Sequence, residues 1–434
     1  MSRQCWVYGF VFLATTLVNA QEIPLVSTDN VGDAVANRSV PFVELLRQAE
    51  AGDKFAQYSV ASAYATGNGV ARNDAERVRW LLEAARSGFA EAQNKLGYLY
   101  YRGVGVPQDY GEAARWFGMA AEQKLAVAQN NLASMYQLGE GVPVDFARAV
   151  DLYRQAAAQG LAPARNALGL AYLHGTGVPR NATEAFKLFH LAAEQGLSAA
   201  QQNLGVTYLE GEGTARNYPE ALRWFSRAAD GGVLEAYHCL GRMYEFGNGV
   251  DRDPAKAAEL YRQAAERDLL TAQIELGTLY MTGKGVQRDY SEAAKWFGRA
   301  AARGHPIAET AIGVFYYRGE GVSCDYRQAA YWFQKAAEQN NALAQSNLGI
   351  LYQNGLGVPL NYSEAYKWFT LAAHGGITTS KHALAGLKQT MTASQIRDGQ
   401  ARVSDWISRY TNLKFATEKT DAKELEGYAT AAQP

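Results

Sequence analysis

The stretch from Tyr98 to Gln123, "YLYYRGVGVPQDYGEAARWFGMAAEQ", joins two helix-like segments through a glycine-rich loop. Its Gly103-x-Gly105 arrangement can cradle a phosphate when it lies between a strand and a helix. No segment before these glycines reads as a strand, and a phosphate loop is needed only once per site. The pattern instead recurs every 36 residues, which predicts a structural loop in a repeated unit. Its nine copies are Gly67/Gly69, Gly103/Gly105, Gly139/Gly141, Gly175/Gly177, Gly211/Gly213, Gly247/Gly249, Gly283/Gly285, Gly319/Gly321 and Gly355/Gly357.

The sequence pattern of each repeated unit predicts two helices. In the first, Ala92, Leu96 and Tyr100 have counterparts in every unit, and their spacing of four residues marks one face of a helix. In the second, the pair Trp116-Phe117 recurs as aromatic residues or Leu, and Ala120-Ala121 recurs in all nine units. A small residue close to a large one permits tight packing of antiparallel helices.

The ends of the second helix are marked as well. Asp109 and its counterparts precede it and are suited to cap its N-terminus. Glycine follows its C-terminus in six units, where a left-handed residue is expected. Lys124, Asp268 and Asn340 stand there in the other three units, and the lysine should cost on the order of 1 kcal/mol.

Composition agrees with a repeat array. The chain has 434 residues, of which 48% are hydrophobic and 20% charged, so it is foldable. Its length exceeds what one conventional core supports, and a single helical hairpin cannot bury both of its faces. We therefore predict one solenoid of stacked hairpins. The net charge of −1 gives no reason to expect nucleic acid or an anionic membrane as a partner.

The repeated pattern, "A-x-A-Q-x-x-L-G-x-x-Y-x-x-G-x-G-V-x-x-D-x-x-x-A-x-x-W-F-x-x-A-A-x-x-G", resembles the Sel-one-like repeat (SLR) family, a branch of the tetratricopeptide-like superfamily. The resemblance implies an all-α, right-handed α/α superhelical solenoid of about nine hairpins with capping helices at both ends. It also implies an adaptor for protein complexes. Similar bacterial proteins are often exported and linked to envelope assembly, signalling or host interaction.

The same pattern suggests a domain organisation. We expect a signal peptide at 1–20, a flexible linker at 21–38, an N-terminal capping helix at 39–52 and nine repeats at 53–376. C-terminal capping helices should follow at 377–411, with Thr392 and Gln395 forming a capping box. A disordered tail is expected at 412–434.

The superfamily resemblance places ligand-facing positions on the first helix, at the positions of residues 94, 98 and 101. An apolar stripe on a solvent-facing groove would indicate a partner, whereas packing between neighbouring helices would bury some of these side chains. Tyr101 and Tyr317 are the best candidates for exposure. The apolar members are Tyr98, Tyr101, Leu170, Leu173, Val206, Leu209, Val314, Tyr317 and Ile350.

Amide side chains share the position of residue 94 in consecutive units, as Asn94, Asn130, Asn166 and Gln202. Such a ladder could hydrogen-bond the backbone of a bound peptide. Because "A-Q-x-N-L-G" is close to the family pattern, a structural hydrogen-bond role is the favoured interpretation.

Catalytic, cofactor and metal sites are not expected. The six histidines fall at different positions of the repeat, and no zinc-ligand spacing or nucleophile elbow is present. His305 and Glu309 are four residues apart, but Pro306 between them favours a helix start. Cys239 and Cys324 lie too far apart in the array to form a disulfide. The oligomeric state is left open.

Three functional hypotheses remain. The main one is an exported, non-enzymatic scaffold that binds a protein or peptide in its groove. The second is an envelope enzyme or accessory acting on cell-wall glycan or linked to β-lactams, although the cysteine pairs of the β-lactam-associated relatives are missing here. The third is a eukaryotic secretory-pathway degradation adaptor, suggested by glycosylation sequons at Asn37, Asn181 and Asn361. The last two also sit where a second helix begins, which favours a capping role.

The N-terminal sequence has the features of a secretory signal peptide. Arg3 precedes an apolar run from Cys5 to Val18, and small residues at Val18 and Ala20 mark a cleavage site before Gln21. An uncleaved anchor is the alternative. We expect N-terminal sequencing of the native protein to begin at Gln21 in an exported fraction. Soluble cytosolic protein that retains Met1 would contradict export.

Overall fold

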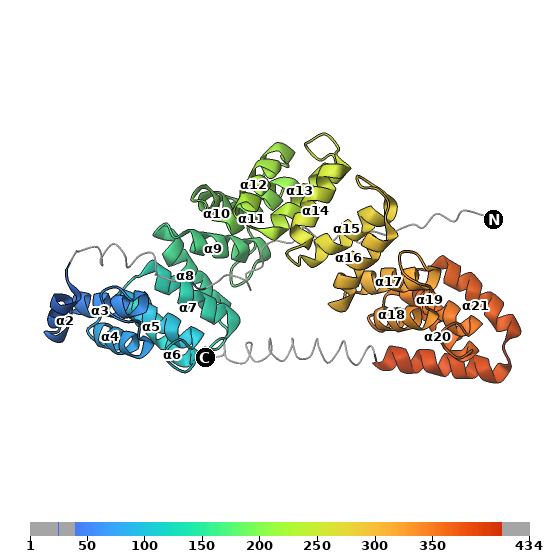
Figure 1. Cartoon of the computed structure of the whole chain (residues 1–434), viewed down its shortest axis with the longest axis horizontal. Coiled ribbons are helices and arrows are strands. Elements are labelled where there is room, and N and C mark those ends of the chain that lie inside the picture. The colour runs from blue at the N-terminus through green and yellow to red at the C-terminus, as the bar shows by residue number, and fades with distance from the viewer. Residues whose placement is uncertain (1–24, 26–39, 410–434) are drawn as a thin grey trace. The chain divides into compact units, whose positions relative to one another are not determined.

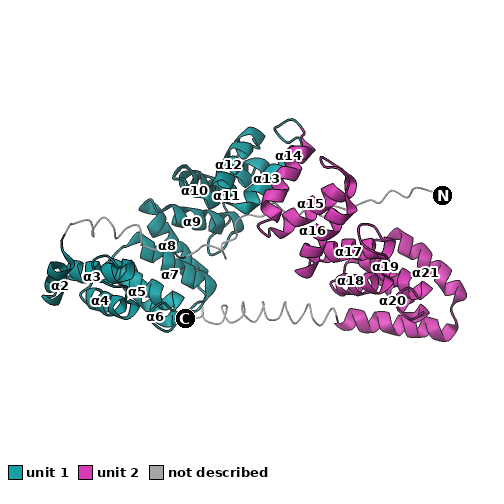
Figure 2. Cartoon of the chain, in the orientation of Figure 1, with its two compact units in different colours: residues 1–243, 247–251 teal, residues 244–246, 252–434 magenta. Residues whose placement is uncertain are grey.

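The computed structural model describes residue 25 and residues 40–409, and among these residues it contains helices and loops but no strand (Figure 1). The expected signal peptide and tail lie outside the described residues, as does the expected linker except for Leu25. The chain divides into two compact units, residues 1–243 with 247–251 and residues 244–246 with 252–434 (Figure 2). Within each unit, successive helices pack against one another as antiparallel hairpins.

Each repeat supplies one hairpin of two helices. The first helices are α3 (Lys54–Thr66), α5 (Ala90–Arg102), α7 (Ala126–Leu138), α9 (Ala162–His174), α11 (Ser198–Glu210), α13 (Leu234–Phe246), α15 (Leu270–Thr282), α17 (Pro306–Arg318) and α19 (Ala342–Asn354). The second helices are α4 (Asp74–Arg86), α6 (Tyr110–Glu122), α8 (Phe146–Ala158), α10 (Ala182–Glu194), α12 (Tyr218–Asp230), α14 (Pro254–Ala265), α16 (Tyr290–Ala302), α18 (Tyr326–Glu338) and α20 (Tyr362–His374). Helix α2 (Phe42–Glu50) precedes them, and α21 (Thr378–Thr390) and a helix over residues 393–409 follow.

A glycine against an aromatic ring closes most hairpins. In α5, a Cβ on Gly97 would lie 2.8 Å from the ring of Phe117 on α6. Because glycine has no Cβ, the two helices approach until the ring fills this space. Phe117 and its counterparts Phe189, Phe225, Phe333 and Phe369 are completely or almost completely buried. The expected tight packing of the two helices is therefore confirmed.

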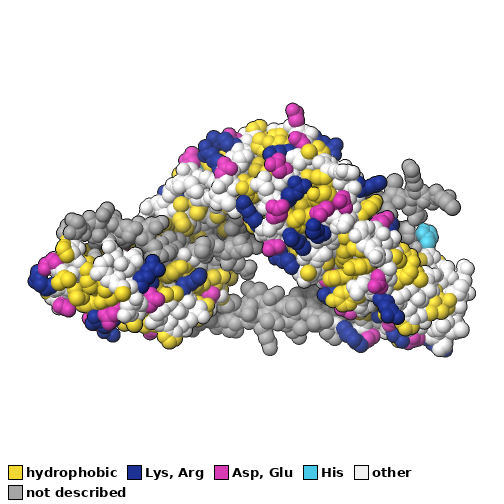
Figure 3. All heavy atoms as spheres, in the orientation of Figure 1, with side chains coloured by type: hydrophobic (Ala, Val, Ile, Leu, Met, Phe, Trp, Pro, Cys, Tyr) yellow, Lys and Arg dark blue, Asp and Glu magenta, His cyan; other side chains and the backbone are white. Residues whose placement is uncertain are grey.

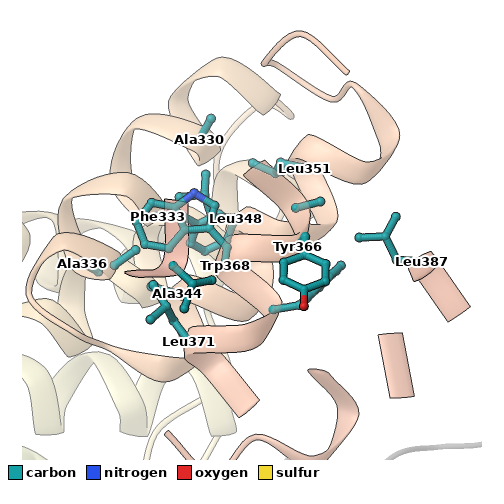
Figure 4. Close-up of a cluster of buried hydrophobic side chains, with 14 of the residues drawn as sticks. Ala330, Phe333, Ala336, Ala344, Leu348, Leu351, Tyr366, Trp368, Leu371 and Leu387 are labelled. Atoms are coloured by element: carbon teal, nitrogen blue, oxygen red, sulfur yellow. The ribbon is translucent and has the colours of Figure 1, made fainter. Parts of the chain in front are cut away.

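The core continues from one hairpin to the next. Figure 4 shows the last repeats, where Phe333 of α18 and Trp368 of α20 converge with Leu348 of α19. These side chains belong to one buried cluster together with the paired alanines of α18. Since a lone hairpin would leave one face of this cluster exposed to solvent, each repeat depends on its neighbour for burial.

A polar clamp joins successive hairpins. Gln93 Nε2 in α5 donates to the backbone oxygen of Ala85 at the end of α4, at 3.0 Å. The same bond recurs from Gln57, Gln129, Gln201, Gln273 and Gln345, and Arg165 Nε makes it in its repeat. The clamp adds a side-chain donor to a carbonyl in the last turn of the helix, which also accepts from the backbone N–H of Gly88 at 3.0 Å.

The loop inside each hairpin is held by its capping residue. The backbone N–H of Asp109 donates to the oxygen of Tyr100 at 2.9 Å, and the Asp109 carboxylate accepts from the backbone of Glu112 at 2.9 Å. All nine capping Asp or Asn residues accept such a bond, which confirms the expected caps. Asn181 and Asn361, the two sequons at helix starts, are among them.

The two loop glycines have different reasons to be glycine. Gly103 ends α5 in the left-handed region, with φ of 66°, whereas Gly105 has φ of 72° and continues the loop. The second glycine of most loops also packs on the preceding repeat. A Cβ on Gly141 would overlap the backbone carbonyl of Tyr110. The positive φ angles and these contacts support a structural role for the loop.

The three residues that replace glycine after the second helix are left-handed, as expected, with φ of 63° at Lys124, 66° at Asp268 and 62° at Asn340. Asp268 and Asn340 gain a compensating bond, because their side-chain oxygens accept from Gln273 and Gln345 at 3.2 and 3.0 Å. A lysine has no side-chain oxygen for this bond, so the cost at Lys124 is not offset in the same way.

The tyrosines of the repeated helix face lie at the edge of the core. Tyr100 and its eight counterparts are half-buried rather than buried. Each of these tyrosines accepts a hydrogen bond from the capping residue at its backbone oxygen. Its ring therefore lies where the first helix meets the loop, at the edge of the core.

The ends of the array have further contacts. Gln57 Nε2 donates to the oxygen of Ala49, so α2 takes the place of a preceding second helix. At the other end, Trp406 packs edge-on against Trp368 with ring centroids 5.0 Å apart. Thr392 and Gln395 bond each other's backbone N–H groups at 3.2 and 2.8 Å, which confirms the capping box.

A graded set of glycine-to-alanine changes tests these roles. Gly118→Ala, within α6 and without a close neighbour, should stabilise by about 0.5–1 kcal/mol. Gly88→Ala, left-handed but also without a close neighbour, should destabilise by about 1 kcal/mol. Gly141→Ala adds a backbone overlap and should cost at least about 2 kcal/mol. Denaturant unfolding of the three variants gives the order, and equal effects at Gly88 and Gly141 would contradict the packing role.

Candidate functional site

The structure buries half of the expected partner-binding residues. Six of the twelve are at most 3% exposed: Asn94, Asn130, Asn166, Leu170, Leu173 and Val206. Of the two alternatives, packing between neighbouring helices rather than exposure on a groove therefore holds for these six side chains. Tyr98, Tyr101, Leu209, Val314, Tyr317 and Ile350 are half-buried.

Packing between neighbouring first helices explains the buried amides. Asn131 of α7 donates to the side-chain oxygen of Asn94 in α5 at 3.2 Å, and Asn203 of α11 donates to Asn166 in α9 at 2.9 Å. Gln202 likewise donates to the sulfur of Cys239, at 3.4 Å. These bonds link residues 37 apart, one repeat plus one residue. Asn94, Asn166 and Gln202 therefore join repeats, in agreement with the favoured interpretation, whereas the side-chain amide of Asn130 is buried without a hydrogen-bond partner in the described part of the chain.

The buried leucines belong to a core cluster. Leu170 and Leu173 of α9 lie in one cluster with Phe189 of α10, Leu204 of α11 and Trp224 of α12. Leu170 and Leu173 thus remain between the helices, whereas Leu209, at the same repeat position as Leu173, is half-buried. The longer tyrosines at the same positions reach beyond this layer, and they are only half-buried.

The N-terminal unit carries an aromatic patch formed by Tyr98, Tyr101 and Tyr110, called here the N-terminal patch. The rings of Tyr101 and Tyr110 have centroids 5.1 Å apart and an interplanar angle of 55°. The Tyr101 hydroxyl donates to the Glu140 carboxylate of the next repeat at 2.9 Å. Burial and this bond raise the pKa of Tyr101 to about 12, so its hydroxyl stays protonated at neutral pH.

A buried cation lies close to this patch. The Lys95 ammonium is 5.9 Å from the centroid of the Tyr98 ring. Lys95 is buried, and burial lowers its pKa to about 8. The aromatic rings of the N-terminal patch therefore have the Glu140 carboxylate and the Lys95 ammonium beside them.

The C-terminal unit carries a matching pair, Tyr317 and Tyr326, called here the C-terminal patch. Their ring centroids are 5.5 Å apart, with an interplanar angle of 60°. Tyr317 occupies the same repeat position as Tyr101, and Tyr326 the same position as Tyr110. Val314, Tyr317 and Ile350 all pack against the buried cluster of the last repeats. The structure thus places two similar tyrosine pairs on two different hairpins.

The sequence reasoning missed Tyr110 and Tyr326. Both stand at the first position of a second helix, directly after the capping aspartate. A signal was present, because the same position holds an aromatic residue in six of the nine repeats: Tyr110, Phe146, Tyr218, Tyr290, Tyr326 and Tyr362.

A second feature of the C-terminal unit is an open hollow of about 630 Å³ beside α18 and α20. Arg327 and Tyr331 line it together with Glu364, Lys367 and Arg402. The Glu364 carboxylate pairs with Lys367 and with Arg402, each at 2.6 Å. Through Glu364, Arg402 fastens the helix over 393–409 to α20, so the arrangement of these paired groups is explained by packing.

Charge does not mark a further site. On the face shown in Figure 3, basic and acidic side chains are interspersed, with hydrophobic side chains between them. No group of three His, Cys, Asp or Glu residues within the described parts of the chain could hold a metal ion. None of the helices over the described ranges has the length and apolar character that a membrane crossing requires. Cys239 and Cys324 are both free thiols.

Comparisons with known proteins agree with this architecture. The Sel1 repeat model matches nine consecutive segments that together run from residue 54 to residue 377. No curated protein matches the chain.

Two similar solved structures come from bacteria. One is c5321, a protective antigen present in uropathogenic Escherichia coli strains and displaying an SLR fold. It is 30% identical, with a TM-score of 0.50, over 88% of this chain and 97% of that one. The other is a Sel1 repeat protein from Oxalobacter formigenes, 32% identical with a TM-score of 0.57 over 76% of this chain and 96% of that one. With its nine matched repeats and its all-α hairpin architecture, the chain belongs to the Sel1 repeat family.

Proposed function

We propose that this chain is an exported, non-catalytic scaffold that binds a protein or peptide partner through its two tyrosine patches. Sel1 repeats mediate protein–protein interaction, and this chain carries nine of them. The geometry of the two tyrosine pairs supports the patches as the contact points.

The observation that carries the proposal is the repetition of one arrangement. Tyr101 with Tyr110, and Tyr317 with Tyr326, occupy equivalent repeat positions and are only partly covered. Binding energy at interfaces concentrates in a few such residues, and tyrosine is among the most frequent because it offers a large rigid face with a polar tip. Hairpin packing does not require these rings, since Leu173 and Gln137 replace the tyrosine in other repeats.

Export is supported by the N-terminal sequence and by one similar protein. The E. coli c5321 protein is described as a protective antigen, and an antigen must be reachable by antibodies. A periplasmic or secreted location would bring this chain's patches into contact with envelope or extracellular proteins.

Loss of the patch tyrosines should weaken partner binding without unfolding the array. Tyr101→Ala and Tyr317→Ala should each reduce affinity at least about tenfold, because an anchor residue contributes roughly 2 kcal/mol or more. The measurement is a quantitative pull-down from the native envelope fraction, followed by binding measurements with the partner it identifies.

Two variants serve as controls. Tyr331→Ala removes a tyrosine that is 51% exposed but outside both patches, and it should leave binding unchanged. Phe117→Ala removes a completely buried ring and should cost about 3–5 kcal/mol in stability. The proposal fails if Tyr101→Ala and Tyr317→Ala fold normally and retain the full affinity for every partner.

A further inference from the structure

One repeat carries a carboxylic acid at the position of the clamp that joins successive hairpins. Seven of the nine repeats have Gln or Arg there, and the side chain donates to a backbone oxygen eight residues earlier. The other two repeats have Tyr237 and Glu309. Glu309 lies in α17 and is only 1% exposed, so its carboxyl group belongs to the interior of the array.

One carboxyl oxygen of Glu309 makes a contact that glutamine makes elsewhere in the array. Gln339 Nε2, at the end of α18, donates to Glu309 Oε2 at 2.8 Å. In the same way Gln123 Nε2 donates to Gln93 Oε1 at 2.8 Å. Because glutamate and glutamine have the same shape, the second oxygen of Glu309 takes the place of the Gln93 amide nitrogen. By this equivalence it faces the backbone oxygen of Ala301 in the last turn of α16.

The protonation state of Glu309 decides whether this repeat has a clamp. An ionised carboxylate can only accept hydrogen bonds, and the backbone oxygen of Ala301 is an acceptor as well. Two acceptors that face each other repel. A protonated carboxyl group has one O–H, which can donate to that oxygen as the glutamine amide does in other repeats. The repeat therefore has its clamp only when Glu309 is protonated.

The surroundings of Glu309 favour protonation on balance. Burial raises the pKa of Glu309 above its ordinary value. On α18, the Lys335 ammonium and the Gln339 amide act against burial, whereas the Glu338 carboxylate acts with it. The net direction is upward, so the interior position of the carboxyl group outweighs the nearby cation.

Two basic side chains lie near Glu309 on the other elements around it. His305, at the start of α17, is half-buried, and burial lowers its pKa, so it brings no positive charge at neutral pH. Arg303, just after α16, donates to the backbone oxygen of Asp268 in the preceding repeat at 2.6 Å. Lys335 is therefore the cation that acts on Glu309 at neutral pH.

We propose that the junction between α16 and α17 is acid-strengthened: protonation of Glu309 forms the clamp to Ala301, and ionisation releases it. Because the folded-state pKa of Glu309 is raised, the stabilisation is fully present below the unfolded-state pKa of a glutamate, about 4.3. It is lost as the pH rises through the folded-state pKa. Helix α17 also carries Tyr317 of the C-terminal patch, but this response to pH requires no partner.

Hydrogen exchange followed by mass spectrometry tests the junction in the full chain. Peptides from residues 300–318 are compared between wild type and Glu309→Gln at the same pH, so that the intrinsic effect of pH on exchange cancels. At pH 7 we expect Glu309→Gln to slow exchange at least about fivefold, because one hydrogen bond of ordinary strength shifts an opening equilibrium by about this factor. At about pH 4 the two chains should exchange at the same rate.

The matched control rebuilds the acidic clamp in another repeat. Gln93→Glu places a carboxyl group beside Gln123, as Glu309 lies beside Gln339. Both substitutions keep the shape of the side chain. Exchange in residues 84–102 of the Gln93→Glu chain should be about fivefold faster than in wild type at pH 7 and equal to it at about pH 4.

Three results would overturn the proposal. Equal exchange of wild type and Glu309→Gln at pH 7 would show that ionised Glu309 does not weaken the junction. A difference of the same size at both pH values would show that titration of Glu309 is not its cause. A Gln93→Glu chain that exchanges like wild type at both pH values would show that the clamp position does not confer the response.

Discussion

The close approach of a glycine on the first helix to an aromatic ring on the second determines how each hairpin is built. At Gly97 the space of a missing Cβ is taken by Phe117, and five further repeats have the same pair. Where alanine replaces the glycine, at Ala61 and Ala133, the opposing residue is Leu81 or Tyr153. Both of these are buried as well. Each first helix therefore packs against its own second helix on one side and against neighbouring first helices on another.

This layering explains which side chains remain available for binding. Positions that would face a groove in an isolated hairpin are covered by the next repeat, so polar residues there need partners, as Asn94 finds in Asn131. Leu170 and Leu173 at the same positions become part of the core, whereas Leu209 is half-buried. Tyrosine is long enough to reach beyond the layer, and its hydroxyl can then bond a group on the next repeat, as Tyr101 does with Glu140. A binding surface on this array is thus local and differs from repeat to repeat.

The sequence predicts the hairpins well because their signals are local. Helix faces, caps and loop glycines recur at fixed spacing, and even the left-handed Lys124 follows from its place in the pattern. Exposure of the groove positions is not local, because it depends on how closely one first helix approaches the next. The 36-residue period is the same for Leu173, which is buried, and Tyr101, which is not. Leu25, which packs against the buried cluster of α6 and α7, lies outside the repeat pattern altogether, so periodicity gives no information about this contact.

Hydroxyl-radical footprinting of the free protein tests the central claim, that packing between repeats and not position within the repeat decides exposure. Oxidation rates are compared among leucines, so that intrinsic reactivity is constant. The account predicts that Leu170 and Leu173 react as slowly as the buried Leu96, while Leu191 and Leu360, which are exposed, react rapidly. Rapid oxidation of Leu170 and Leu173 would contradict it, because these residues would then line an open groove.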